Sequence, residues 1–260
     1  MLVCGWSISP PGGSSDSRCT PDITGKHPHG YIVNGVDDVL KATRENFKFG
    51  ADAVKIMVTS DLEAMSMTYD EIQAAVQMAK AHNATSCAHA SGVQSIKALV
   101  EAGITSIEHG TIVDEEAAQM MKDNGVYLVP TLLAMETMTK RSDRSEGGEE
   151  PQRRARECFD IYLDKGVKIG FGSDAAIPHI EHGKQMREFE LMVEMGMTPA
   201  EALKSATKTN AEILGWEAKI GSIEVGKYAD IVAFDKNPLE DISCMDRCGF
   251  VMKDGVVYKA

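Results

Sequence analysis

The sequence predicts an α/β fold built from about six βα units around a parallel sheet, followed by a small β-rich tail. From residue 51 onward, short apolar runs alternate with amphipathic helices that a glycine or an asparagine closes. The runs are apolar throughout, as is typical of parallel strands covered on both faces. After Gly215 the pattern changes to short strands with glycine turns, which indicates hairpins. The alternation before that point favours right-handed βα units.

The apolar runs define the expected strands, and cap signals define the helices between them. Thr68 and Glu71 form a capping box for the helix that follows the second run. We expect later helices to begin at Ser91 and Asp114 and to stop at Gly103 and Gly125. The expected strands are residues 2–8, 53–58, 85–90, 105–109, 126–131 and 168–173. Residues 140–154 mix both charges with two glycines, so we expect a solvated loop there.

Composition excludes several classes of protein. The chain has 260 residues, of which 43% are hydrophobic, enough for a sizeable core. A net charge of −12 argues against nucleic acid or an anionic membrane as partner. We expect no signal peptide and no membrane span, because the first residues lack a basic region and no apolar run reaches 18 residues. Six cysteines without a CxxC pair indicate reduced thiols, and we therefore expect a cytoplasmic protein.

Four side chains that can bind a metal ion fall in or at the ends of expected strands. Lys55 lies within the second strand, while His89, His109 and Asp174 lie at the ends of later ones. In a parallel barrel these strand ends converge on one mouth, where active sites lie. Imidazole nitrogen and carboxylate oxygen are ligands that Zn²⁺ prefers. The pattern therefore predicts a site for Zn²⁺ or a similar divalent ion.

Each of these residues also has a structural interpretation. A single histidine at a strand end is often a hydrogen-bonded structural group, and Lys55 could extend its ammonium group to solvent. Asp174 could cap a helix. Strand alternation places Glu108 on the side opposite His109, toward the helix layer, where it needs a partner.

Several motifs together resemble the amidohydrolase superfamily, in particular its imidazolonepropionase-like branch with the Xaa-Pro dipeptidases. They are VKIMVT, CAHAS, IEHG, GFGSDA, MTPAEALKSATKTNAEILG and GSIEVGKYADIVAFDKNPLEDI, and the resemblance runs along the whole chain. It implies an incomplete (β/α)8 TIM barrel with a remnant of a small β-sandwich. Residues 1–215 would form the barrel domain and residues 216–260 the strands of the composite sandwich domain.

The resemblance also implies roles for the four residues. Lys55 would be carboxylated and bridge two metal ions, and His89 and His109 would bind the second ion. Asp174 would bind the first ion and shuttle the proton during hydrolysis by a metal-activated hydroxide. Such an ion lowers the pKa of bound water to about 7 and polarises the carbonyl group.

The chain departs from the family pattern at its beginning. The family's first strand carries a His-x-His pair, whereas the first strand here resembles the family's third. His27 and His29 form the one His-x-His, but they follow a loop, and Pro28 denies a ladder hydrogen bond. Six strands do not close an eight-stranded barrel, so we expect a truncated enzyme with open edges. Either a second copy or a complementing chain covers those edges, or the edges meet in a strained smaller closure, or the protein is marginally stable.

Secondary candidates for substrate binding lie near the expected mouth. His179 and His182 follow the last expected strand, and Thr131 ends the fifth; the two histidines could equally be solvated loop residues. We interpret His82 as structural, because it ends a helix where a cationic imidazole suits the dipole.

These observations favour a metal-dependent amidohydrolase acting on an amide or peptide-like C–N bond, of the dipeptidase, carboxypeptidase or cyclic-amide kind. The substrate would be a small or peptide-like molecule. The alternative is a catalytically inactive, truncated remnant that serves as a binding or scaffolding subunit.

Overall fold

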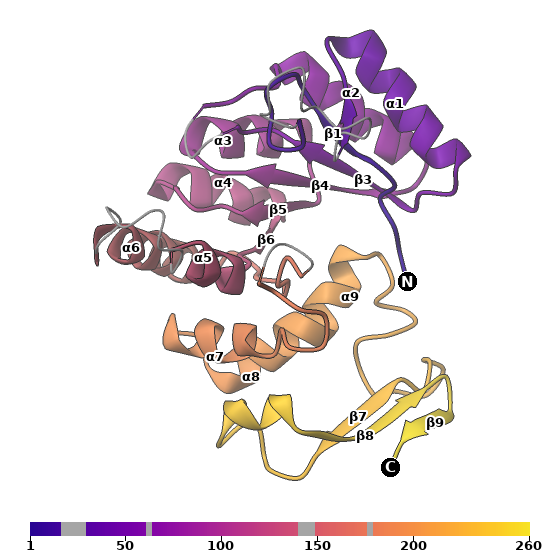
Figure 1. The fold of residues 1–260 in the computed structure, drawn as a ribbon, viewed down its shortest axis with the longest axis vertical. Helices are drawn as coiled ribbons and strands as arrows, with labels where there is room; N and C mark the ends of the chain where they lie inside the picture. The colour runs from indigo at the N-terminus through magenta and orange to yellow at the C-terminus, as the bar shows by residue number, and fades with distance from the viewer. Residues whose placement is uncertain (17–29, 61–63, 140–148, 176–178) are drawn as a thin grey trace. The chain divides into compact units, whose positions relative to one another are not determined.

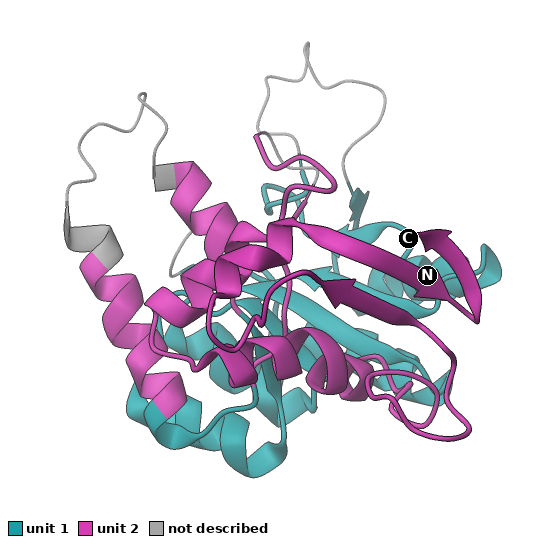
Figure 2. Ribbon diagram, turned by 90° about the horizontal axis from the view of Figure 1, so that it is seen from below, with its two compact units in different colours: residues 1–129, 164–168 teal, residues 130–163, 169–260 magenta. Residues whose placement is uncertain are grey.

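The structure of the chain, a computed structural model, describes residues 1–16, 30–60, 64–139, 149–175 and 179–260 (Figure 1). It divides into two compact units. Unit 1 comprises residues 1–129 and 164–168, and unit 2 comprises residues 130–163 and 169–260 (Figure 2). His27 and His29 lie outside the described residues, so their role stays a prediction.

Unit 1 contains a parallel sheet of six strands in the order β2-β1-β3-β4-β5-β6. All its pairings are parallel, and the helices that connect its later strands follow the βα pattern expected from the sequence (Figure 1). The predicted α/β class, an incomplete barrel with a separate small β-sheet, is confirmed. The strands are β1 (Ser7–Ser9), β2 (Gly30–Ile32), β3 (Ala53–Met57), β4 (Thr85–Ala90), β5 (Ser106–His109) and β6 (Tyr127–Val129).

The two faces of this sheet differ in character. Alternate residues such as Ile56, Ala88 and Ile107 are fully buried. Helix α2 contacts β3 and β4, and each helix from α1 to α4 contacts the next. Residues between the buried ones, such as Lys55 and His89, are only half-buried on the other face. This arrangement leaves Lys55 and His89 on the same side of the sheet. The helices are α1 (Val36–Lys48), α2 (Tyr69–Ala81), α3 (Val93–Ala102) and α4 (Glu115–Asn124).

Most of the predicted helix boundaries are confirmed. The Thr68 hydroxyl accepts a bond from the Glu71 N–H at 3.4 Å, and the Glu71 carboxylate accepts one from the Thr68 N–H at 2.8 Å. Asp114 caps α4, while Gly103 and Gly125 end their helices in the left-handed conformation. The expected cap at Ser91 is wrong. Gly92 holds that position without a side-chain bond.

Three further expectations fail. Residues 168–173 form no strand of the sheet. The start of this segment still bonds to β6, because the Leu128 N–H donates to the Lys168 carbonyl at 3.0 Å. Strand β2 is present although its three residues carry no recognisable strand pattern. The expected loop at 140–154 ends early, because α6 (Glu149–Lys165) begins within it; residues 140–148 are outside the described part.

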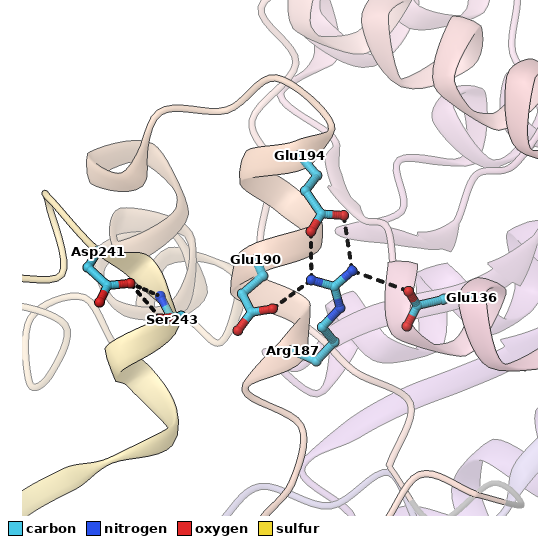
Figure 3. A network of polar contacts seen from close by, with 6 residues as sticks. All are labelled: Glu136, Arg187, Glu190, Glu194, Asp241 and Ser243. Carbon is cyan, nitrogen blue, oxygen red and sulfur yellow. Dashed lines mark hydrogen bonds and ion pairs between the residues drawn. The ribbon is translucent and has the colours of Figure 1, made fainter.

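Unit 2 contains helices and an antiparallel sheet of three strands in the order β7-β8-β9, which confirms the hairpins predicted for the tail. Arg187 joins two of its helices. Its guanidinium bonds Glu136 of α5 at 3.3 Å and both Glu190 and Glu194 of α7 at 2.6 Å (Figure 3). The elements are α5 (Leu132–Thr139), α6, α7 (Arg187–Glu194), α8 (Pro199–Lys204), a π-helix (Ser205–Thr209), α9 (Asn210–Ile213), β7 (Ile231–Phe234), a 3₁₀ helix (Ile242–Asp246), β8 (Cys248–Lys253) and β9 (Val256–Lys259). None of the described helices has the length and apolarity needed to cross a membrane.

Candidate metal centre

One face of the unit 1 sheet carries a row of polar side chains. In the strand register, Lys55 of β3 lies beside Cys87 of β4, and His89 of β4 lies beside Glu108 of β5. Residues that are neighbours in a parallel register share a face, as do residues two apart on one strand. Lys55, Cys87, His89 and Glu108 therefore lie on the same face, the one opposite the buried apolar residues.

His109 joins this group through an unusual backbone conformation. Simple alternation would direct its side chain toward the helix side, because its register partner is the buried Ala90. Its φ angle is 71°, in the left-handed region that residues other than glycine seldom adopt. The ring instead packs edge-on against His89, with centroids 4.6 Å apart and planes at 68°. The Gly110 N–H closes the turn by donating to Ala90 O at 3.0 Å and Glu108 O at 3.1 Å.

Both imidazoles are held in their neutral form. Burial and the nearby Lys55 ammonium lower the pKa of His89 to about 4. Burial, His89 and Lys55 hold the pKa of His109 well below its ordinary value. A neutral imidazole keeps a free ring lone pair at neutral pH, which is the form that binds a metal ion. The pair is therefore electronically suited to coordinate a cation.

Lys55 has an anionic partner on the same face, and this corrects the expectation for Glu108. The Lys55 ammonium donates to the Glu108 carboxylate at 3.4 Å, and the Ser106 hydroxyl donates to the other oxygen at 2.7 Å. Glu108 does not point toward the helix layer, because His109, and not Glu108, departs from the strand alternation. Although burial alone would lower the pKa of Lys55, Glu108 and the Cys87 thiol raise it above its ordinary value.

A sequence profile of the amidohydrolase family matches residues 15–258, nearly the whole chain. The chain belongs to the amidohydrolase family. Ochratoxinase from Aspergillus niger is 30% identical over 246 residues, which cover 88% of this chain and 50% of that relative. A crystal structure of a Xaa-Pro dipeptidase with methionine bound in its active site is 36% identical, with a TM-score of 0.88 over 100% of this chain and 68% of the other. Imidazolonepropionase from Geobacillus kaustophilus is 30% identical over 176 residues, which cover 65% of this chain and 37% of that relative.

The matches confirm the family resemblance of the sequence motifs. The chain spans about half the length of these curated relatives, such as the ochratoxinase.

Two thiols that the sequence pattern did not single out also reach the polar face. The Cys4 and Cys87 side chains are hydrogen-bonded, and Lys55 and Glu108 act electrostatically on both. That bond, burial and Glu108 raise the pKa of Cys87 well above its ordinary value. Both cysteines are free thiols, as the composition predicts. The spacing of two between Cys87 and His89 is the one sequence signal that could have revealed this position.

The remaining candidate residues belong to unit 2. Thr131 is buried and has a φ angle of 49°, whereas Asp174 is exposed with a φ angle of 55°. His179, with a φ angle of 74°, and His182 are both exposed. Backbone conformations of this kind cost about 1–3 kcal/mol each and are often found at functional sites.

Glu188 of α7 fixes the backbone beside Thr131. Its carboxylate, fully buried, accepts the Leu132 N–H at 2.9 Å and the Leu133 N–H at 2.7 Å. These are amides at the start of α5, which have no partner within the helix and favour an anion. Burial raises the pKa of Glu188 to about 7 against the lowering effect of the two amides. Nothing in the local sequence pattern indicates this role.

The donor set fits part of a metal centre. Two neutral imidazoles side by side supply two nitrogen ligands, whereas Lys55, charged and paired with Glu108, supplies none in that state. Within the ranges described, no group of three or more histidine, cysteine, aspartate or glutamate side chains is arranged to hold a metal ion. The structure thus brings together Lys55, His89 and His109 on one face of unit 1.

Proposed function

We propose that this amidohydrolase is a metal-dependent hydrolase of amide or peptide-like C–N bonds. The metal centre would use His89 and His109 as ligands, together with Lys55 and Asp174. The observation that carries the proposal is the adjacent pair of neutral imidazoles, which requires a strained backbone at His109. A purely structural histidine has no need of that conformation.

Each of these residues would have a separate role in the reaction. His89 and His109 would hold the ion, and a bound ion would supply a water of lowered pKa and a polarised substrate carbonyl. The carboxylate of Asp174 would accept and return the proton. Lys55 would serve as a ligand only with its ion pair to Glu108 open, because carboxylation requires a neutral amine. Residues 1–215 would carry this centre, and residues 216–260 would form the strands of a small sandwich.

The named relatives suggest substrates for the first assays. A Xaa-Pro dipeptidase, a prolidase complexed with N-methylphosphonate-L-proline and an ochratoxinase are all similar to this chain. We infer that the substrate has an amide-linked amino-acid part, and that Xaa-Pro dipeptides and ochratoxin are suitable probes. Thr131, His179 and His182 are the proposed substrate contacts.

The test combines elemental analysis with hydrolysis. Purified chain is expected to retain Zn²⁺ or a similar ion and to release proline from Xaa-Pro dipeptides. His109→Ala should weaken metal binding by more than about 100-fold, since loss of an outer-shell partner alone costs 10- to 100-fold. His82→Ala is the matched control, because that exposed imidazole only stacks on Phe47, with centroids 4.0 Å apart. Equal metal content in both variants would contradict the proposal.

The second candidate is a catalytically inactive chain that acts as a binding or scaffolding subunit. The ion pair that keeps Lys55 cationic favours it. Metal binding at His89 and His109 without hydrolysis, either alone or when a complementing chain is added, would support this reading.

A further inference from the structure

The segment that leads to Asp174 takes part of its backbone hydrogen bonding from a side chain. Residues 169–174 of unit 2 form no strand of either sheet. A backbone N–H and C=O away from water each need a partner, and strand ladders usually provide both. At Phe171, one side chain provides them instead. The Phe171 N–H donates to Asn210 Oδ1 at 3.0 Å, and Asn210 Nδ2 donates to the Phe171 carbonyl at 2.9 Å.

Asn210 is well fixed for this task. It is the first residue of α9 and directly follows the π-helix Ser205–Thr209, an irregularity often found at functional sites. Its neighbours Thr209 and Ala211 are buried, so the helix backbone on both sides is packed. The Phe171 ring lies against the ring of Phe189 of α7, with centroids 4.4 Å apart. Phe171 is therefore held through its side chain as well as its backbone.

Three residues beyond Phe171, Asp174 adopts a left-handed backbone with a φ angle of 55°. Such a conformation persists only when the surrounding structure holds it. We propose that Asn210 is a positioning residue for Asp174: its side-chain amide holds the Phe171 backbone and so fixes the turn that presents the Asp174 carboxylate. This inference rests on the proposed function, in which Asp174 is a metal ligand.

Unit 1 offers a matched control. Asn46 makes the same two bonds to Trp6: the Trp6 N–H donates to Asn46 Oδ1 at 3.1 Å, and Asn46 Nδ2 donates to the Trp6 carbonyl at 2.8 Å. Asn46→Ala therefore removes the same pair of hydrogen bonds as Asn210→Ala, but at a segment that carries no proposed ligand.

The experiment measures the Zn²⁺ affinity of the full chain by competition with a chelating dye. Asn210→Ala should weaken binding by about 10- to 100-fold, as loss of an outer-shell partner does, while Asn46→Ala leaves it unchanged. In an Asp174→Asn background, Asn210→Ala should cause no further loss, because the two residues act as one unit. A purely structural role would give additive losses.

The outcomes separate the two proposals. Equal affinities for Asn210→Ala and Asn46→Ala, or additive losses with Asp174→Asn, overturn this inference while the proposed function stands. A wild-type chain that binds no Zn²⁺ overturns the proposed function and this inference with it. If Asn210→Ala does not fold, the Zn²⁺ affinities of Asn210→Asp and Asn46→Asp are compared, since aspartate keeps the bond from the backbone N–H. A partial loss of affinity in Asn210→Asp alone supports the inference. Equal affinities in the two variants overturn it.

Discussion

At the scale of single residues, the candidate site depends on a backbone angle that no sequence pattern reveals. Alternation along β5 predicts opposite faces for Glu108 and His109, which is correct for an ideal strand. The left-handed turn at His109 brings its ring to His89, and Glu108 lies beside Lys55. The residue types and their spacing were predictable, but this turn and the ion pair were not. Both His109 and Gly110 have positive φ angles, 71° and 55°.

The strain at His109 predicts an unusual order of stabilities. His109→Gly should be more stable than His109→Ala by about 1 kcal/mol, because a left-handed conformation costs a residue with a Cβ roughly 1–2 kcal/mol. Both variants lose the same imidazole, so their difference isolates the backbone. Urea denaturation of the two proteins measures it. If the alanine variant is as stable as the glycine variant, the backbone at this position is unstrained.

At the scale of elements, cap residues predicted helices better than apolar runs predicted strands. The capping box at Thr68 and the glycine stops at Gly103 and Gly125 depend on local geometry, which the sequence specifies directly. A strand requires a partner elsewhere in the chain. The apolar run at 168–173 forms no strand: the Lys168 carbonyl accepts from the Leu128 N–H of β6, whereas Asn210 bonds the Phe171 backbone.

Glu188 makes the attachment of α7 to the start of α5 sensitive to pH. Its folded pKa of about 7 lies above its ordinary 4.5, so the folded chain binds the proton more tightly than the unfolded chain. Its contribution to stability is full below pH 4.5 and is lost as pH rises through 7. As pH rises between those limits, the free energy of unfolding of the wild type should fall by up to about 3 kcal/mol relative to that of Glu188→Gln.

Unfolding in urea at pH 5 and pH 8 measures this loss for both proteins. Glu201→Gln is a suitable control, because that exposed carboxylate has a lowered pKa, so its contribution to stability is already complete at pH 5 and changes little up to pH 8. Parallel pH profiles for the wild type and Glu188→Gln would show that Glu188 is ionised throughout.

At the scale of the whole molecule, composition and motifs predicted the fold class and the family better than the division of the chain into domains. The βα repeat and the hairpin tail indicate the α/β class, and motifs such as CAHAS, IEHG and GFGSDA resemble the family that the profile match shows. The assignment of residues 1–215 and 216–260 to separate domains stays a prediction, since the compact units divide the chain elsewhere. The chain spans about half the length of the curated relatives it matches, so the activity of the whole protein stays a proposal.

The central claim is that His89 and His109 share a metal ion. Anomalous diffraction at the zinc edge, from crystals grown with Zn²⁺, tests it most directly. The account predicts a peak about 2.0–2.1 Å from a ring nitrogen of each histidine. Zinc peaks only at other positions, with the His89–His109 pair empty, would contradict it.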